Sequence, residues 1–597
     1  SRRNGNAFAT TPSVDLNGNL LTSAGGQPLF VNTINVFQDI NDPNRRAIDQ
    51  VWVGPQYLKR MPLPNDYSVG DGLNTAGFRW LRRHKGSDGA TGVDPNTNRD
   101  SLSTRFDYQV SSGNKVSYSM TREQNWGVTG QTGLPAYPDG FFGEVQRRPD
   151  FYSASWTSTV SPTVLNEFRW GFKRDSWIGW NPFLIGCCYD GKAEDAISES
   201  SKEVTATYPK IPTGHLLYVN PTAAGAGGLG IGTYAFYGVP TPRYSKSPLM
   251  QFANTLSWTT GAHSFQGGFE ATYANSDQSN TGGAATSVPS STLGVGNIPV
   301  PGVTTANFRG LNSNDIGTVQ NLLASLSGSI ASLSHQYFMN SPTQTTFSDY
   351  RETLSFARNF HQNDWAAFFK DNWKVTSNLT LNLGLRVDKY GVPYDSSGLG
   401  VRPKGGQAGL FGSSGADFSA MWNPNASGGS PTVLEFAGKS SPNPDTLIYG
   451  NDSNNFAPSI GFSWNLPWFA RSTVVRGGYG VNYTGAATFL QFSSNLASAP
   501  GSSLAVTLVP PTYMNIASVA GGNVFPLSTG GIRPFEPVPT TNRTTNFNAY
   551  ADDRMTPYVQ NFNLSIQREL ARNMTLEVSY VGSKGAKLWG TTQLNEI

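Results

Sequence analysis

Residues 365–390 read WAAFFKDNWKVTSNLTLNLGLRVDKY, and this stretch decides the fold class. In its second half, aliphatic side chains occupy every second position: Leu379, Leu381, Leu383, Leu385 and Val387. The residues between them are polar or small: Thr380, Asn382, Gly384, Arg386 and Asp388. Side chains of a β-strand point alternately to its two faces, so this spacing predicts a strand with one aliphatic face and one polar face.

Hairpins with this alternation recur along the chain. The predicted strand pairs are 102–110 with 114–122, 151–160 with 163–174, 250–259 with 263–274, 364–376 with 379–390, 456–465 with 472–484, and 558–569 with 573–583. A short turn joins each pair, and long segments, mostly rich in Gly, Asn, Ser and Thr, follow the first five pairs: 123–150, 175–249, 275–363, 391–455 and 485–557. This rhythm is typical of an outer-membrane barrel with periplasmic turns and extracellular loops. We therefore predict an all-β fold: a partial, antiparallel, up-and-down transmembrane β-barrel of about twelve strands.

The composition excludes a helical membrane protein. Only 38% of the residues are hydrophobic, the mean hydropathy is −0.35, and no apolar run reaches the ~18 residues that a membrane helix needs. Aromatic residues make up 12%, which suits strands and interfacial girdles. The net charge is +3 and no Lys/Arg run occurs, so nucleic acid is not an expected partner.

Charged residues fall on the polar faces of their predicted strands. Four of them are expected to line a wet lumen: Arg169, Glu270, Arg386 and Arg476. On the lipid side a mid-depth Arg or Lys would cost about 2–4 kcal/mol, whereas in a lumen it costs little. Asp371 is an exception, because it shares the apolar face of its strand with Trp373. It is therefore expected near the headgroups rather than at mid-depth.

The long loops carry the candidate ligand-binding residues, since connections longer than about 15 residues are usually functional or disordered. Their aromatic side chains are candidates for stacking on sugars or apolar ligands: Trp126, Phe141, Phe142, Trp177, Trp180, Tyr234, Phe236 and Tyr237. Packing within the loops or membrane anchoring is the other interpretation.

One loop also holds an apolar stripe with helical spacing. Its members are Ile316, Val319, Leu322, Leu323, Leu326, Ile330, Leu333 and Tyr337. Spacings of three and four residues place them on one side of a helix. The stripe therefore predicts a helix packed against its own loop.

No motif indicates catalysis, a cofactor or a metal. Gly225-Ala-Gly227-Gly-Leu-Gly230 matches GxGxxG, but no convincing strand precedes it and no helix follows it. The histidines are scattered, without an HExxH or GxSxG pattern. Cys187 and Cys188 are adjacent, so they cannot build a disulfide framework or a four-ligand zinc site, and their role is left open. We expect no enzyme, no cofactor and no metal site.

Several hairpins resemble those of TonB-dependent outer-membrane receptors. Residues 365–386 are similar to a barrel hairpin that commonly reads FFxQDxWKVTPNLTLNLGLRYE, with Ser377 in place of Pro. Further similar segments are NFAPSIGFSW at 455–464, VRGGYGVNY at 475–483, PYVQNFNLSIQREL at 557–570 and LEVSYVGSKG at 576–585. MPLPN at 61–65 and GLNTAGF at 72–78 look like the large loop of the Oar-like subgroup.

The resemblance implies a barrel of roughly 22 strands, an N-terminal plug, and a TonB box that engages a TonB-type energy-coupling partner. Neither plug nor TonB box is recognisable here, and the chain starts at Ser1 without an initiator Met or a signal peptide. We therefore expect a barrel fragment that lacks the plug, with strands missing at least at its C-terminal end. Residues 1–101 are expected to form a large extracellular loop region and residues 102–597 the barrel portion.

The implied function is transport through the outer membrane of a Gram-negative type of cell. Extracellular loops would capture a small molecule such as a siderophore, a glycan or a peptide, and the lumen would pass it inward. Outer-membrane lipid is the other expected partner. The alternatives are a non-transporting adhesin or passive porin, and a soluble all-β carbohydrate-binding protein. A plug and TonB box encoded upstream would favour the transporter, and detergent-free solubility would favour the soluble protein.

Overall fold

The structure is a computed structural model. It describes residues 6–12, 22, 25–26, 30–35, 37, 40–58, 98–127, 145–179, 208–220, 243–279, 288–307, 313–352, 357–406, 433–485, 501–536, 550–551 and 553–590. Within these ranges, no helix has both the length and the apolar character needed to cross a membrane.

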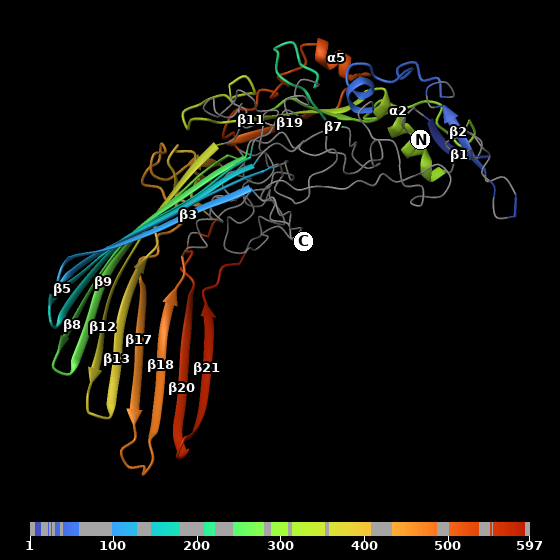
Figure 1. Cartoon of the computed structure of the whole chain (residues 1–597). Coiled ribbons are helices and arrows are strands. Elements are labelled where there is room, and N and C mark those ends of the chain that lie inside the picture. Colours follow the sequence, from blue (N-terminus) through green and yellow to red (C-terminus); the bar gives the residue numbers. More distant parts are fainter. Residues whose placement is uncertain are drawn as a thin grey trace, which may run out of the picture.

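The molecule is built on one large curved sheet whose main strands are antiparallel and follow chain order (Figure 1). Its hairpins are β3 (Asn98–Ser111) with β4 (Asn114–Gly127), β5 (Val145–Ser161) with β6 (Val164–Gly179), β8 (Arg243–Thr260) with β9 (His263–Ser279), β12 (Ala357–Lys374) with β13 (Leu379–Lys389), β17 (Asn455–Asn465) with β18 (Thr473–Tyr483), and β20 (Tyr558–Ala571) with β21 (Met574–Ala586). The short β14 (Tyr394–Asp395) adds to β12. The predicted hairpins are confirmed, and among the described strands β3 and β21 form the two edges of the sheet.

The first three hairpins, and strand β12 of the fourth, reach further toward the loops than predicted. β5 begins at Val145 instead of 151, and β6 runs to Gly179 instead of 174. The residues in these extensions include Arg147, Arg148 and Asp150, which interrupt the apolar alternation. The periodicity therefore ends where the apolar band ends, although backbone pairing continues beyond it.

The turns at the opposite end are short and use residues that tolerate a left-handed backbone. Gly261, between β8 and β9, has φ +56°, and Asn573, between β20 and β21, has φ +65°. Glycine and asparagine adopt this conformation at low cost, which permits a tight reversal of the chain. The long connections consequently all leave the sheet from its other end.

The register gives the sheet one continuous apolar face. Leu383 pairs with Asp371 of β12 and with Ile460 of β17. Ile460 pairs with Tyr479, which in turn pairs with Phe562 of β20. Directly paired residues lie on the same face of a sheet, so the aliphatic sets of separate hairpins join into one surface.

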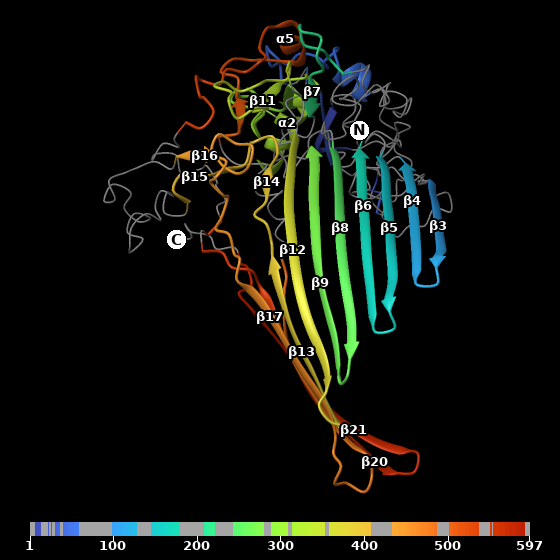
Figure 2. The same ribbon diagram turned by 90° about the vertical axis from the view of Figure 1, so that its left-hand side faces the viewer.

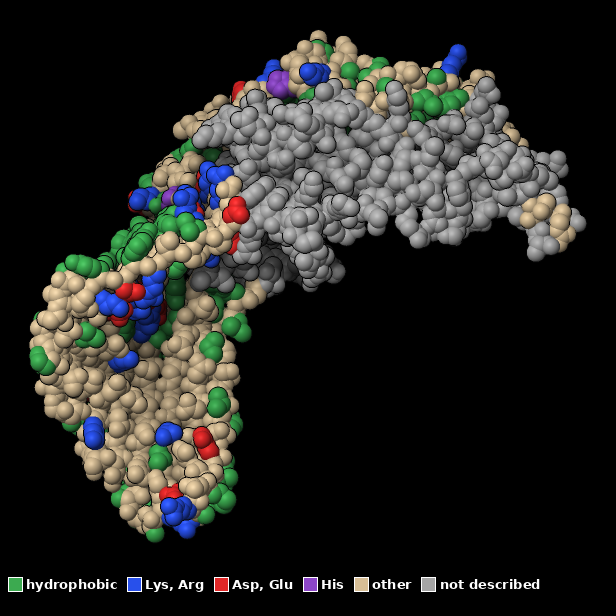
Figure 3. Space-filling model, in the orientation of Figure 1, with side chains coloured by type: hydrophobic (Ala, Val, Ile, Leu, Met, Phe, Trp, Pro, Cys, Tyr) green, Lys and Arg blue, Asp and Glu red, His purple; other side chains and the backbone are tan. Residues whose placement is uncertain are grey.

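This apolar face is on the outside of the curve. Leu385, Leu564 and Ile566 are each 48% exposed. A soluble protein rarely exposes an apolar surface that extends over so many strands. Figure 2 shows the convex side of the sheet, and Figure 3 shows hydrophobic side chains along the outer contour with a mostly polar concave surface. Such a division is the one that a membrane barrel requires, with lipid outside and water within.

Asp371 lies near the turn end of β12, as expected from its position on the apolar face. Its Oδ2 atom lies 2.7 Å from Nδ1 of His263, the first residue of β9. The imidazole is stacked between the rings of Phe265 and Trp373, with centroids 5.3 Å away on each side. An aromatic cluster with a polar pair suits the interfacial level of a membrane.

The long loops fold together into a second body, which we call the head. Its sheet has the order β19-β11-β10-β7, formed by β7 (Tyr218–Asn220), β10 (Ser290–Leu293), β11 (Ile330–Phe338) and β19 (Ser503–Leu508). These strands come from three different long loops. The head also contains α2 (Ile316–Leu326) and α5 (Ile516–Gly521), and it lies above the loop ends of the large sheet (Figures 1 and 2).

A hydrophobic core unites the head. Trp52, Leu217, Leu323 and Val519 are at most 1% exposed, and they come from four separate stretches of the chain. Burying an aliphatic or aromatic side chain contributes about 1.5–3 kcal/mol. The loops therefore stabilise one another and do not fold separately.

The predicted helical stripe is correct in its first part and wrong in its second. α2 ends at Leu326, and Ile330, Leu333 and Tyr337 lie on β11 instead. Gly328 has φ +67° and its Cα lies against Asp49, where a Cβ would come within 2.8 Å of a side-chain atom. The chain reverses at this glycine, so the apolar spacing continues while the helix does not. As predicted, the helix packs against its own loop, but it also packs against others.

Smaller elements complete the described structure. They are the hairpin of β1 (Asn6–Pro12) and β2 (Phe30–Asn35), the pair β15 (Val401–Pro403) and β16 (Leu434–Phe436), the π-helix η2 (Val53–Tyr57) and the 3-10 turn η6 (Ser313–Asp315). β15 and β16 pack with Met339 in a second apolar cluster. This cluster joins the loop after β13 to the loop that carries β11.

Candidate functional site: the lumen and the head

The concave face of the sheet carries a charged cluster on β9 and β13. Arg386 Nη2 donates to Oε2 of Glu270 at 2.8 Å, and its Nε donates to Oδ1 of Asp388 at 2.9 Å. β12 lies between these strands and places Ala366 opposite both Glu270 and Asp388. The small alanine leaves space for the long side chains to meet above it.

Arg169 lies at the same level of the concave face as this charged cluster. It pairs with Ala253 of β8, which pairs with Glu270 of β9, so one row of the sheet contains both charges. Arg169 Nε lies 3.8 Å from Glu167 Oε1, and both side chains are largely exposed. Arg476 lies elsewhere, because it is close to the start of β18 and pairs with Ser463 and Ser565 near the turn end. The structure thus brings together three of the four predicted lumen residues.

The ion pair between Arg386 and Glu270 is accessible, whereas Asp388 is nearly buried. The side chains of Arg386 and Glu270 are 36% and 30% exposed. Partly exposed pairs of this kind contribute about 0–1 kcal/mol each, so a polar ligand can exchange with them at little cost. Carboxylates that accept and guanidinium groups that donate offer both kinds of hydrogen bond to a passing molecule.

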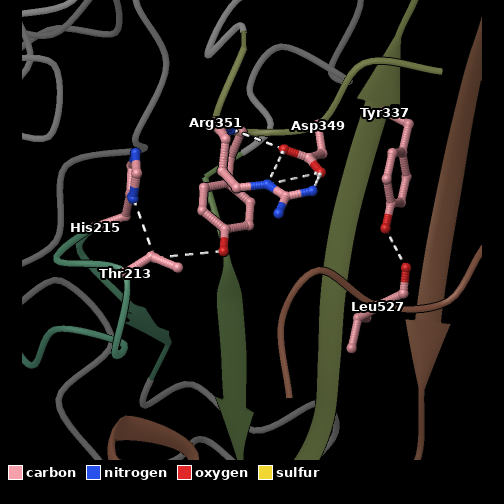
Figure 4. A network of polar contacts seen from close by, with 7 residues as sticks. Thr213, His215, Tyr337, Asp349, Arg351 and Leu527 are labelled. Atoms are coloured by element: carbon pink, nitrogen blue, oxygen red, sulfur yellow. Dashed lines mark hydrogen bonds and ion pairs between the residues drawn. The ribbon is translucent and has the colours of Figure 1, made fainter. Parts of the chain in front are cut away.

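The polar centre of the head joins residues from three loops (Figure 4). Thr213 Oγ1 lies 3.1 Å from Nδ1 of His215 and 3.4 Å from the hydroxyl of Tyr350. Next to Tyr350, Arg351 donates from its backbone N and from Nε to Asp349 Oδ1, at 2.9 and 3.0 Å. These contacts tie the segment after β11 to the segment before β7.

A histidine is buried beside this network. His335 is 3% exposed, and its ring centroid lies 4.1 Å from that of Tyr337 and 5.3 Å from that of Tyr350. Neither ring nitrogen has a hydrogen-bond partner among the described residues. Burial lowers the pKa of His335 to about 4, against the raising effect of Asp349. The imidazole is therefore neutral at pH 7.

A second polar anchor holds the N-terminal segment to the head. Arg45, fully buried, donates from Nη1 to Oδ2 of Asp42 at 2.7 Å and from Nη2 to the carbonyl of Ile298 at 3.0 Å. Asp49 accepts from the backbone N–H groups of Trp52 and Val53 at 2.7 and 2.8 Å. Segment 40–58 is consequently part of the head.

The candidate aromatic residues are only partly placed. Trp126 and Trp177 lie in strands β4 and β6, not in loops as predicted, because these strands extend beyond the apolar alternation. Phe141, Phe142, Trp180, Tyr234, Phe236 and Tyr237 lie outside the described residues, as do Cys187, Cys188 and the GxGxxG stretch. Their role in binding therefore stays a prediction.

No sequence pattern indicated the polar residues of the head. Thr213 and His215 come from one loop and Tyr350 from another, and only tertiary packing brings the two loops together. Within the described ranges, no three His, Cys, Asp or Glu side chains are close enough to hold a metal ion.

The comparison with protein families agrees with this geometry. The model of the family described as "Outer membrane beta barrel domain" matches residues 1–597, the whole chain. The chain belongs to this family. The outer membrane β-barrel domain family accounts for the antiparallel strands, the exposed apolar face and the polar concave face, and it locates the protein in the outer membrane of a Gram-negative type of cell.

No curated protein sequence matches the chain. Among solved structures, similar ones include FpvA of P. aeruginosa bound to heterologous pyoverdines, at 8% identity and TM-score 0.33, with 82% of this chain and 41% of FpvA covered. The copper transporter OprC has 8% identity and TM-score 0.34, with 82% and 45% covered. The siderophore receptor PirA from Acinetobacter baumannii has 9% identity and TM-score 0.34, with 82% and 43% covered. The chain spans less than half the length of these three proteins, and identities and TM-scores this low do not define a shared function.

Proposed function

We propose that this chain is the barrel portion of an outer-membrane receptor that captures a ligand with its extracellular head and passes it through its lumen. The observation that carries the proposal is the head itself. Loops that merely connect strands do not need a shared sheet and a shared core, and here several loops have both.

The polar concave face of the sheet supports the proposed passage of the ligand through the lumen. Arg169, Glu270 and Arg386 lie at one level of the concave face, below the head. The ion pairs of Arg169 with Glu167 and of Arg386 with Glu270 are exposed and weak enough to exchange with a ligand. A ligand leaving the head would therefore meet a row of donors and acceptors rather than an apolar surface.

We further propose that transport is energised through a TonB-type partner, as the resemblance to TonB-dependent receptors implies, and that the chain is of the Oar-like type. This part of the proposal concerns the whole protein, since the chain spans less than half the length of the three similar structures. The protein is proposed to bind and transport its ligand without chemical change. The ligand class is a siderophore, a glycan or a peptide.

The experiment measures uptake of labelled siderophore, glycan and peptide probes by cells that express the full-length protein. Uptake above that of cells without the protein, abolished when an uncoupler dissipates the proton-motive force, supports energised transport. Uptake that the uncoupler leaves unchanged identifies a passive pore. Surface binding without any uptake identifies an adhesin.

The variant arm of the experiment tests the lumen. Replacing both Glu270 and Arg386 with glutamine removes the charges and keeps the size of the side chains, so we expect a several-fold fall in uptake with unchanged binding to the cell surface. The matched control is Arg568→Gln, because Arg568 lies on the outer face at the turn end, over the ring of Phe469. Equal uptake by the two variants would contradict the proposed path.

A further inference from the structure

The upper edge of the apolar outer face carries a charged row on β4, β5 and β6. Arg122 pairs with Asp150, and Asp150 pairs with Arg174. The next pairs below are Met120 with Tyr152, and Tyr152 with Phe172. Because residues two apart on a strand share a face, the charged row lies on the lipid side of the wall and not in the lumen.

Asp150 holds the two guanidinium groups in place. Its side chain is 3% exposed, and it contacts Nη2 of Arg174 and lies 3.4 Å from Nε of Arg122. The two arginine side chains are 44% and 59% exposed, so each keeps donors on the surface. The structure gives neither arginine a second acidic partner among the described residues, so the cluster carries a net charge of one positive unit.

The depth of the row matches the headgroup level. The outward residues of β5 below it run from Tyr152 to Val160, which is about 26 Å of strand at about 3.3 Å per residue. A tilt of about 40° reduces this to about 20 Å, close to the height of the apolar band of an outer-membrane barrel. The rings of Tyr152 and Phe172, with centroids 6.1 Å apart, lie directly below the charges.

Further charged residues lie one row higher on the same face. Arg148 of β5 pairs with Ser176 of β6, Ser176 pairs with Lys246 of β8, and Lys246 pairs with Asp277 of β9, so this row carries both signs of charge. Figure 3 shows Lys and Arg side chains, with Asp and Glu among them, above the hydrophobic contour where the strands approach the head. Charged side chains thus continue upward from the headgroup level, where the polar part of a lipid lies.

We propose that Arg122 and Arg174 form a binding site for the phosphate of a lipid headgroup in the outer leaflet. Guanidinium groups donate two parallel hydrogen bonds to a phosphate, and Asp150 orients both groups before the lipid arrives. The aromatic row beneath receives the acyl chains of the same molecule, which is why the site selects a lipid over a free phosphate ion. The assignment to the outer leaflet rests on the proposed function, in which the head is extracellular.

The test is native mass spectrometry of the purified protein with added lipids: diphosphorylated lipid A, the same lipid after dephosphorylation, and inorganic phosphate as a competitor. We expect the diphosphorylated lipid to be retained at least tenfold better than the dephosphorylated one. We expect the double variant Arg122→Gln with Arg174→Gln to lose this preference, and Arg105→Gln to keep it. Arg105 is a matched control because it also pairs with an aspartate, Asp107, at 2.8 Å, but on the opposite face of the sheet.

Equal retention of the two lipids by the wild-type protein would overturn the proposal, as would a preference that survives in the double variant. Complete displacement by millimolar inorganic phosphate would show that a free ion, not a lipid, occupies the site. Circular dichroism establishes that each variant keeps its strands. No transport ligand is present in the lipid-binding assay, so a negative result there does not contradict the proposed transport function. A negative result in the uptake assay likewise does not contradict the lipid site.

Discussion

At the scale of single residues, the same types of side chain have different roles because of the face they occupy. Arg386 is on the concave face and pairs with Glu270, whereas Arg174 is on the outer face and pairs with Asp150. The difference follows from strand parity alone, since each β-strand presents alternate residues to lipid and to water. His335 belongs to neither face, because it is buried inside the head.

We expect His335 to make the head sensitive to acid. Its pKa in the folded head, about 4, is below the ordinary value of 6.5, so the unfolded segment binds a proton more readily than the folded one. The stability that burial of the neutral ring allows is complete above about pH 6.5 and falls by about 3 kcal/mol at most as the pH drops to about 4. Hydrogen exchange of the β11 amides, corrected for the intrinsic rate at each pH, measures this loss.

The variants of His335 and His215 separate this effect from general acid sensitivity. We expect His335→Phe to remove most of the dependence between pH 6.5 and 4.5, and His215→Phe, at a half-buried ring beside Thr213, to keep it. Burial raises the pKa of Asp349, but the hydrogen bonds and charge of Arg351 lower it further, so the stability that its charge supplies is lost only at lower pH, as the pH falls through its folded pKa. The same slope in both variants would show that His335 is not the responsible group.

At the scale of elements, the strands were predictable and the head was not. In each hairpin, local alternation of apolar and polar residues predicts the strands and the face that each side chain occupies. Leu383, for example, pairs with Asp371 and Ile460 on the predicted apolar face. The head depends on contacts between distant segments: β11 pairs with β19, and His335 lies opposite Val506. No local sequence periodicity predicts such a pairing between distant segments. The apolar spacing therefore indicated a helix for Ile330 and Leu333. The charged extensions of β5 and β6 were missed for a similar reason, since pairing continues there without an apolar pattern.

The shared core predicts that damage to one loop spreads to the others. Leu217 is fully buried in the core, so Leu217→Ala is expected to destabilise the head by about 2–5 kcal/mol. We expect protease sites in 313–352 and 501–536 to become accessible together with those in 208–220, as followed by limited proteolysis and peptide mapping. Leu588→Ala, at a side chain that is 69% exposed, is the matched control and should leave the pattern unchanged. New cleavage confined to 208–220 would contradict a single cooperative head.

At the scale of the whole molecule, the long loops leave one end of the sheet and the short turns the other (Figure 2). If the head is extracellular, protease added to intact cells should cut within the head and spare the turns near Pro162, Gly261 and Asn378. The reason is that these turns would lie behind the membrane. Immunoblotting with tags at the two ends of the full-length protein reads the cleavage sites. Cleavage at the turns in intact cells, with the head protected, would reverse the topology.

The central claim is that lipid covers the convex face of the sheet and water fills the concave side. Its most direct test is nitroxide accessibility in lipid bilayers, measured with oxygen as the apolar probe and a nickel chelate as the polar probe. One set of labels replaces outward residues: Leu381, Leu383, Leu385, Phe562, Leu564 and Ile566. The other replaces inward residues: Asn382, Arg386, Asn563 and Gln567. We expect high oxygen and low nickel access for the first set and the reverse for the second. Equal access of both probes to both sets would contradict the account.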